Sequence, residues 1–303
     1  MSKENRKKLK KRTIALITAA AFIGVLLLTF LGFYIAFVVS DARSHTWTPD
    51  CEKMSDAKLK EIYDREELGP DDYKLLFEQT GLTKVGIDRA RERANGWSRV
   101  KTIHDEYFTE RTVDKQFYAP LVCNDRTDRN AREIYLEKGD IVVSSSTHFA
   151  GFRIGHAAIV TNTAGRIFEA TQVGQKSDFN SFDTITDRIN FMVLRVKPEH
   201  FGGGDGSYKE NLSRVTEYIT GELKDAKYSV FTGVFTNKDK INYTMCSHII
   251  WYGFRHFDDG NGGKLALDLD PNGGALVMPK DLSLSPYLEL VQTFGFDPDK
   301  MYE

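Results

Sequence analysis

The amino-acid sequence predicts an α+β fold preceded by one N-terminal membrane-spanning helix. Three observations lead to this prediction: a long uncharged run near the N-terminus, a charged stretch with helical periodicity, and short β-rich segments from about residue 136 onward. A helix beginning near Cys246 completes the expected fold, packed on a small, mainly antiparallel sheet.

The composition indicates one or two globular domains, because 303 residues that are 41% apolar and 28% charged can bury a sizeable core. The formal net charge of -2 shows no basic excess. We therefore expect no nucleic-acid partner.

The N-terminus combines a basic cluster with an apolar run. Residues 1–12 are rich in Lys and Arg, and no residue from Thr13 to Ser40 is charged. This run exceeds the roughly 20 residues that cross a bilayer as a helix. We expect a cytoplasmic basic tail (1–12), a transmembrane anchor (13–40) and an extracytoplasmic remainder at the cell membrane. The alternative is a cleaved signal peptide, with small side chains at Ser40 and Ala42, but the apolar part of such a peptide is usually only about 7 to 15 residues.

Residues 41–130 are expected to form a helical subdomain that packs on the domain following it or spaces that domain from the membrane. Apolar residues between Asp71 and Trp97 recur every three to four positions. Pro70 marks a helix start, and Thr80 with Gly81 marks a break between two helices.

The remainder, residues 131–303, contains strand candidates bounded by turn residues at 140–144, 155–162, 166–173 and 190–196. A Gly-rich connection at 202–206 precedes a helix expected over 207–226.

Three cysteines follow the apolar run: Cys51, Cys123 and Cys246. An odd number outside the cytoplasm indicates either a free thiol with a function or a chain without disulfides. If one disulfide forms, we expect Cys51 to pair with Cys123; both being free is the alternative.

Cys246 lies where a polar segment meets an apolar run of helical character. At a helix N-terminus, the helix dipole and a neighbouring imidazolium lower a thiol pKa from about 8.5 to about 3.5–7.5. A cysteine nucleophile requires such a thiolate. The competing interpretation is a small buried hydrophobic residue.

His156 opens a β-rich segment, and Glu169 interrupts the next one. An even-length loop keeps both on one face of a hairpin, and a register centred between Asn162 and Thr163 would place them directly opposite each other. A carboxylate there fixes the imidazole tautomer and stabilises its charged form. The alternative is a structural histidine at the start of a buried strand.

Four segments occur in order: Lys138-Gly-Asp-Ile-Val-Val143, Gly155-His-Ala-Ala-Ile-Val160, Glu169-Ala170 and Cys246-Ser247. Together they resemble the circularly permuted NlpC-like papain-fold hydrolases of the YiiX-like type, over roughly Leu136 to the C-terminus. Ordinary papain-like enzymes place the Cys before the His, whereas permutation gives the order His, acidic residue, Cys.

The resemblance implies that Cys246 is the nucleophile, His156 the base and Glu169 the residue that orients the base. Such proteins often have Tyr directly before the Cys, whereas Met245 stands here. Tyr243 and Ser247 are therefore candidates for oxyanion or substrate contact, or for packing alone. Three other imidazoles compete for the role of base: His148, His248 and His256. We interpret His248 and His256 as structural or surface residues.

The sequence thus predicts a cysteine hydrolase of the amidase or peptidase type, acting on peptidoglycan stem peptides of the cell wall. The permuted fold also resembles the lecithin retinol acyltransferase group, so a lipid-type acyl substrate is the alternative. A catalytically silent, membrane-tethered binding module is a third hypothesis. No cofactor or metal is expected, because no Cys or His cluster has ligand spacing.

Overall fold

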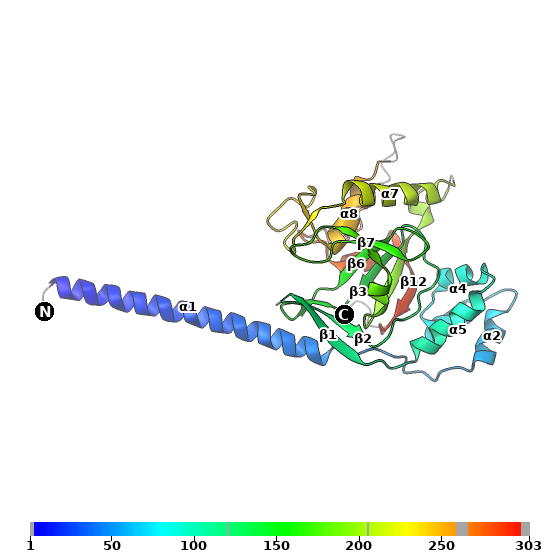
Figure 1. Ribbon diagram of the computed structural model, residues 1–303, viewed down its shortest axis with the longest axis horizontal. Coiled ribbons are helices and arrows are strands. Elements are labelled where there is room, and N and C mark those ends of the chain that lie inside the picture. Colours follow the sequence, from blue (N-terminus) through cyan, green and yellow to red (C-terminus); the bar gives the residue numbers. More distant parts are fainter. Residues whose placement is uncertain (1–2, 120, 205, 259–265, 298–303) are drawn as a thin grey trace.

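A computed structural model describes residues 3–119, 121–204, 206–258 and 266–297 (Figure 1). Its first element, α1 (Lys3–Ala42), is a single helix that extends away from the rest of the chain. The expected basic tail is helical from Lys3 onward, and residues 1–2 lie outside the described residues. Within α1, the 33-residue segment Lys10–Ala42 is long and apolar enough to cross a membrane, as an anchor or as a signal sequence would.

The helical subdomain contains α2 (Asp56–Tyr63), α3 (Pro70–Thr80), α4 (Lys84–Arg91) and α5 (Gly96–Tyr107). Helix α3 begins at Pro70, as predicted, and ends at Gly81, which has a φ of 69°. A Cβ at this glycine would lie 2.1 Å from the carbonyl oxygen of Thr293, so the break between α3 and α4 needs glycine.

Residues 113–127 correct the prediction of a helical segment that continues to residue 130. They form the antiparallel strands β1 (Val113–Ala119) and β2 (Val122–Thr127), which join β4 (Thr147–Phe149) and β5 (Phe152–Arg153) in the order β1-β2-β4-β5. The charged residues in this stretch hide its strand pattern, and pairing with a distant segment decides its conformation. The expected domain boundary at residue 130 therefore cuts through a sheet.

A second sheet has six strands, and every neighbouring pair is antiparallel. Its order is β12-β9-β3-β6-β7-β8. Four strands match predicted segments: β3 (Ile141–Ser144), β6 (His156–Val160), β7 (Arg166–Glu169) and β9 (Phe191–Val196). The edge strands β8 (Asp178–Ser181) and β12 (Leu288–Phe294) were not predicted.

The six-stranded sheet is buried on both faces. Alternate residues such as Val142 and Val193 pack with the apolar side chains of α2–α5, whereas Ile141 and Leu194 pack with those of α7 (Tyr208–Glu222) and α8 (Cys246–His256). The helical subdomain thus packs on the sheet, and the chain has a mixed α+β architecture with antiparallel sheets (Figure 1). Shorter elements complete it: α6 (Asp183–Thr186), η1 (Pro198–His200), β10 (Lys227–Tyr228), β11 (Tyr243–Thr244) and α9 (Pro279–Ser283).

A buried ion pair joins strand β9 to the turn before β3. Arg195 on β9 donates from Nε and Nη2 to the two carboxylate oxygens of Asp140, each at 2.8 Å. Asp140 also accepts a hydrogen bond of 2.7 Å from the backbone N–H of Glu137. The carboxylate thereby fixes the turn that leads into β3.

The cysteines are all free. Cys123 is buried on β2 and Cys51 is exposed, so the disulfide that we considered between them is not formed.

Candidate active site

Cys246 is the first residue of α8, as predicted. Met245 before it is extended, with φ of -133° and ψ of 173°, and apolar residues such as Ile249 and Trp251 then anchor the helix in the core. The Cys246 side chain is 2% exposed. A thiol at this position experiences the positive end of the helix dipole.

His156 and Glu169 lie together on neighbouring strands, also as predicted. His156 Nε2 is 2.6 Å from Glu169 Oε2, and both side chains are buried. The hairpin pairs Ile159 with Phe168, so it is centred one residue beyond the register that would set His156 directly opposite Glu169. The two side chains still share a face, because residues two apart on a strand point the same way.

The second carboxylate oxygen of Glu169 is also held. Asn180 on β8 donates from Nδ2 to Glu169 Oε1 at 2.8 Å. Two donors from two different strands therefore fix the carboxylate plane, and His156 has a single orientation toward it.

The imidazole also interacts with the Cys246 thiol, and this interaction raises the pKa of His156 and lowers that of Cys246. Because Glu169 occupies Nε2, Nδ1 is the ring nitrogen left for the sulfur. The described residues thus contain a continuous array of thiol, imidazole and carboxylate, assembled from α8, β6 and β7.

This array shifts the pKa values of its members in opposite directions. Burial raises the pKa of the Cys246 thiol, but hydrogen bonds from His156 and the backbone N–H of Ala157 outweigh burial, and the net pKa is lowered. Burial and the charge of Arg188 lower the pKa of His156, but Cys246 and Glu169 outweigh them, and the net pKa is raised. Both shifts favour the thiolate–imidazolium pair.

A cavity of about 240 Å³ lies beside His156 and Glu169, and most of the residues that line it are of polar or charged type. It lies between the two sheets, since Asn124 and Thr147 come from the four-stranded sheet and Asn180 from the six-stranded one. Arg188 lines it and is 4% exposed; its Nη1 donates to Thr147 Oγ1 at 2.9 Å. A buried guanidinium close to Glu169 gives the cavity a fixed positive group.

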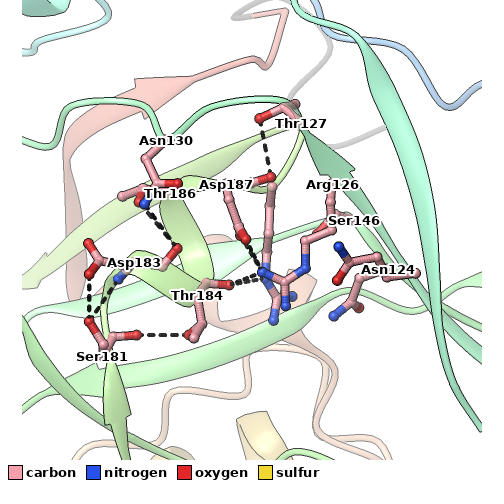
Figure 2. A network of polar contacts seen from close by, with 12 residues as sticks. Asn124, Arg126, Thr127, Asn130, Ser146, Ser181, Asp183, Thr184, Thr186 and Asp187 are labelled. Atoms are coloured by element: carbon pink, nitrogen blue, oxygen red, sulfur yellow. Dashed lines mark hydrogen bonds and ion pairs between the residues drawn. The ribbon is translucent and has the colours of Figure 1, made fainter.

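Figure 2 shows a network of polar contacts that includes three residues of the cavity lining, Asn124, Arg126 and Thr184. The guanidinium of Arg126 points toward Asp187, with which it forms an ion pair, and it donates to the carbonyl oxygen of Thr184 at 3.4 Å. Asn124 lies alongside (Figure 2). Arg126 also donates to the hydroxyl group of Tyr118. Three partners therefore hold the Arg126 side chain in place at the cavity: Asp187, Thr184 and Tyr118.

Sequence reasoning missed Tyr228, the tyrosine that interacts with Cys246. Burial and the thiolate charge both raise the pKa of Tyr228, so it keeps its proton. By contrast, Tyr243 is 41% exposed on β11. The hydroxyl of Ser247 donates to the carbonyl oxygen of Val277 at 2.5 Å, and Ser247 also helps to lower the pKa of Cys246. Tyr228 lies 18 positions before Cys246, and no local signal in the sequence indicates its proximity.

Arg188 and Asn180 were also missed. Each lies in a segment rich in turn residues, where Asn and Arg are ordinary surface residues. Asn180 comes close to Glu169 because β8 pairs with β7, and Arg188 reaches the cavity from the turn after α6.

The rival imidazoles have other partners. His248 is buried, with Nε2 2.7 Å from the carbonyl oxygen of Lys238 and Nδ1 3.0 Å from Thr244 Oγ1. Burial lowers its pKa to about 4. His256 stacks on Tyr252, with ring centroids 4.2 Å apart. His148 is held by Asp125 and Ser40.

One group of possible metal ligands occurs among the described residues: Asp56, His104 and Asp105 in the helical subdomain. Lys101 lies 2.8 Å from a carboxylate oxygen of each aspartate, and Lys53 lies 2.7 Å from Asp105. The carboxylates thus have lysine partners, and this group lies outside the thiol–imidazole array.

The chain matches no protein-family model, no curated protein and no solved structure at a significant level.

Proposed function

We propose that this chain is a membrane-anchored cysteine hydrolase that acts outside the cytoplasm. In this proposal Cys246 is the nucleophile, His156 the base and Glu169 the residue that orients the base. The observation that carries it is the buried grouping of Cys246, His156 and Glu169 at the start of α8, in which His156 Nε2 lies 2.6 Å from Glu169 Oε2 and the thiol and imidazole shift each other's pKa. The order His, Glu, Cys and the antiparallel sheet packed on α8 support a circularly permuted papain-like fold.

In the proposed reaction, the Cys246 thiolate attacks the carbonyl carbon of an amide and forms a C–S bond. The C–N bond then breaks, and the imidazolium of His156 gives its proton to the leaving amine. Water next attacks the thioester while His156 accepts its proton. The acid leaves, and the Cys246 thiolate is regenerated beside the imidazolium.

We propose that two donors stabilise the oxyanion that forms in both steps. The backbone N–H of Cys246 lies at the N-terminus of α8, where the helix dipole favours negative charge. Tyr228 on β10 pairs with Thr244, two positions before Cys246, and its raised pKa means that the phenol keeps its proton. We assign Tyr228 this role in place of Tyr243.

For the substrate, the polar cavity beside His156 supports a peptide, and peptidoglycan stem peptides are the proposed class. Its amide and guanidinium groups match the carbonyl, N–H and carboxylate groups of a peptide. An anchored domain outside the membrane would reach the cell wall.

A lipid-type acyl hydrolase or acyltransferase is the second candidate. It is favoured by exposed apolar side chains at loop tips, such as Phe117 and Phe235. A lipid substrate would bring an acyl chain that such tips can contact.

The test uses the full chain in detergent micelles, incubated with purified peptidoglycan or with short-chain and long-chain acyl esters. We expect peptide release that Cys246→Ala abolishes; ester cleavage alone would instead support the second candidate. Peptide release by Cys246→Ala at the wild-type rate would overturn the enzyme assignment.

A labelling experiment separates a silent binding module from an enzyme whose substrate has not been supplied. In a Cys51→Ser/Cys123→Ser background, chloroacetamide should label Cys246 at pH 6, and His156→Ala should slow this reaction. Equal labelling rates with and without His156 would show that the thiol is not activated.

A further inference from the structure

The ectodomain exposes large apolar side chains in a small number of segments. Outside α1, the described residues of this kind are Phe117, Tyr118, Leu121, Phe152, Val173, Phe231, Val234, Phe235, Tyr243 and Leu284. Six of them form two groups: Phe117, Leu121 and Phe152 at the β1–β2 and β4–β5 turns, and Phe231, Val234 and Phe235 in the segment between β10 and β11. We call these groups the hairpin tip and the loop tip.

Both tips point along α1 toward its N-terminal end. In Figure 1, the β1–β2 hairpin and the yellow segment that follows α7 project further in this direction than the rest of the globular region. The helical subdomain lies on the opposite side (Figure 1). The two tips therefore reach about the same plane perpendicular to the axis of α1.

The hairpin tip packs directly on α1. The rings of Phe33 and Phe152 have centroids 6.5 Å apart. An apolar cavity of about 200 Å³ lies between α1 and the hairpin, lined by residues that include Phe30, Phe37 and Phe117. Gly151 has a φ of +83°, and a Cβ there would lie 2.5 Å from the backbone nitrogen of Phe37.

Buried polar contacts fix α1 to the ectodomain. Ser40 Oγ is hydrogen-bonded to His148 Nδ1, and His148 Nε2 lies 2.6 Å from Asp125 Oδ2. Ser44 Oγ donates to the same carboxylate oxygen at 2.8 Å. His148 and Asp125 are 1% and 0% exposed. The direction of α1 therefore sets the direction of the ectodomain.

The length of α1 places the contact region at the bilayer surface. As a helix, the uncharged run from Thr13 to Ser40 rises about 42 Å, which exceeds a hydrocarbon core of about 30 Å. The excess lies at the end where Phe33 and Phe37 meet the ectodomain. Exposed Lys227 and Lys240 flank the loop tip, at positions suited to anionic headgroups.

We propose that the ectodomain rests on the outer leaflet of the bilayer, with the hairpin tip and the loop tip inserted among the lipids. This inference rests on α1 being a retained membrane span, and it does not depend on the catalytic role of Cys246. Apolar side chains flanked by lysines are the composition of interfacial segments. Acyl chains fill the apolar cavity beside α1.

The test places a tryptophan in each tip and measures quenching by a lipid that carries a doxyl group near its headgroup. The full chain is reconstituted in nanodiscs of phosphatidylcholine and phosphatidylglycerol, as Leu121→Trp, as Phe235→Trp and as the control Lys74→Trp. Lys74 is on α3 with a side chain 74% exposed, in the subdomain that faces away from α1. Wild-type chain gives the background from the three native tryptophans.

We expect doxyl lipid to remove most of the added emission at positions 121 and 235 and none at position 74. Emission at 121 and 235 that resists the quencher as at 74 would overturn the proposal. If the doxyl lipid does not quench the tryptophans and their environment becomes buried only at high protein concentration, the tips contact a second copy of the chain. This result would also overturn the proposal. All three positions are exposed, and the two tip substitutions keep apolar character, so folding is not at risk.

Discussion

The imidazole of His156 and the carboxylate of Glu169 approach to 2.6 Å although the two residues are not direct partners in the strand ladder. The contact is diagonal across the β6–β7 hairpin, and Asn180 holds the far side of the carboxylate. The orientation of His156 therefore depends on a third strand, β8, as well as on the hairpin itself.

Glu169→Gln should lower kcat by about 100-fold or more, because an amide cannot stabilise the imidazolium or select its tautomer as a carboxylate does. The thermal midpoint should change little, since Gln keeps the shape and still accepts from Asn180. The measurements are steady-state kinetics and thermal unfolding of the same preparation. Normal kcat with a large loss of stability would show that Glu169 is structural.

Cys246→Ala and His156→Ala should each remove most turnover, and the double variant should be little slower than either single one. The rate effects of substituting two residues that act as one unit are non-additive, because the remaining partner has no function alone. His248→Ala is the matched control, since His248 is on the same helix but bonds to Lys238 and Thr244. Multiplicative losses in the double variant would contradict a coupled pair.

Activity should show a bell-shaped dependence on pH. The thiolate–imidazolium pair dominates where the pH is above the lowered pKa of Cys246 and below the raised pKa of His156. Arg188→Gln removes a charge that lowers the pKa of His156, so the alkaline limb should move to higher pH. A shift of that limb to lower pH would contradict the electrostatics. The full pH profile of kcat/KM measures both limbs.

Asp140→Ala should destabilise the chain by about 3–5 kcal/mol, because it leaves the buried Arg195 with only the longer contact of 3.6 Å to Glu137. Asp140→Leu combined with Arg195→Met should recover much of this loss. Urea unfolding of the full chain in detergent measures both variants. A loss below about 1 kcal/mol, as for an exposed ion pair, would contradict the buried pairing.

Elements with a strong local pattern were predictable from the sequence. The break after Thr80 carries glycine, and β3, β6, β7 and β9 are short apolar segments between turn residues. The start of α8 at Cys246 follows from the change from polar to apolar residues. In each case the residues that decide the conformation are adjacent in the chain.

Features decided by distant partners were not predictable. Charged residues such as Asp114 and Lys115 hide the strand pattern of β1 and β2, which pair with each other, and β2 also pairs with the more distant β4. Tyr228 on β10 and Arg188 after α6 reach the site only through the tertiary fold, since each is distant in the chain from His156. The register of the β6–β7 hairpin was also predicted one residue off. The turn after Val160 sets this register, and the difference leaves His156 and Glu169 on the same face of the sheet.

The fixed junction at Ser40, His148 and Asp125 determines how such an enzyme would search for its substrate. With α1 in the bilayer and no flexible tether above it, Cys246 stays at one height over the lipid and explores only the two dimensions of the membrane plane. Bonds deep in a thick cell wall would be out of reach. Encounter rates would then scale with the surface density of membrane-proximal substrate, not with its bulk concentration.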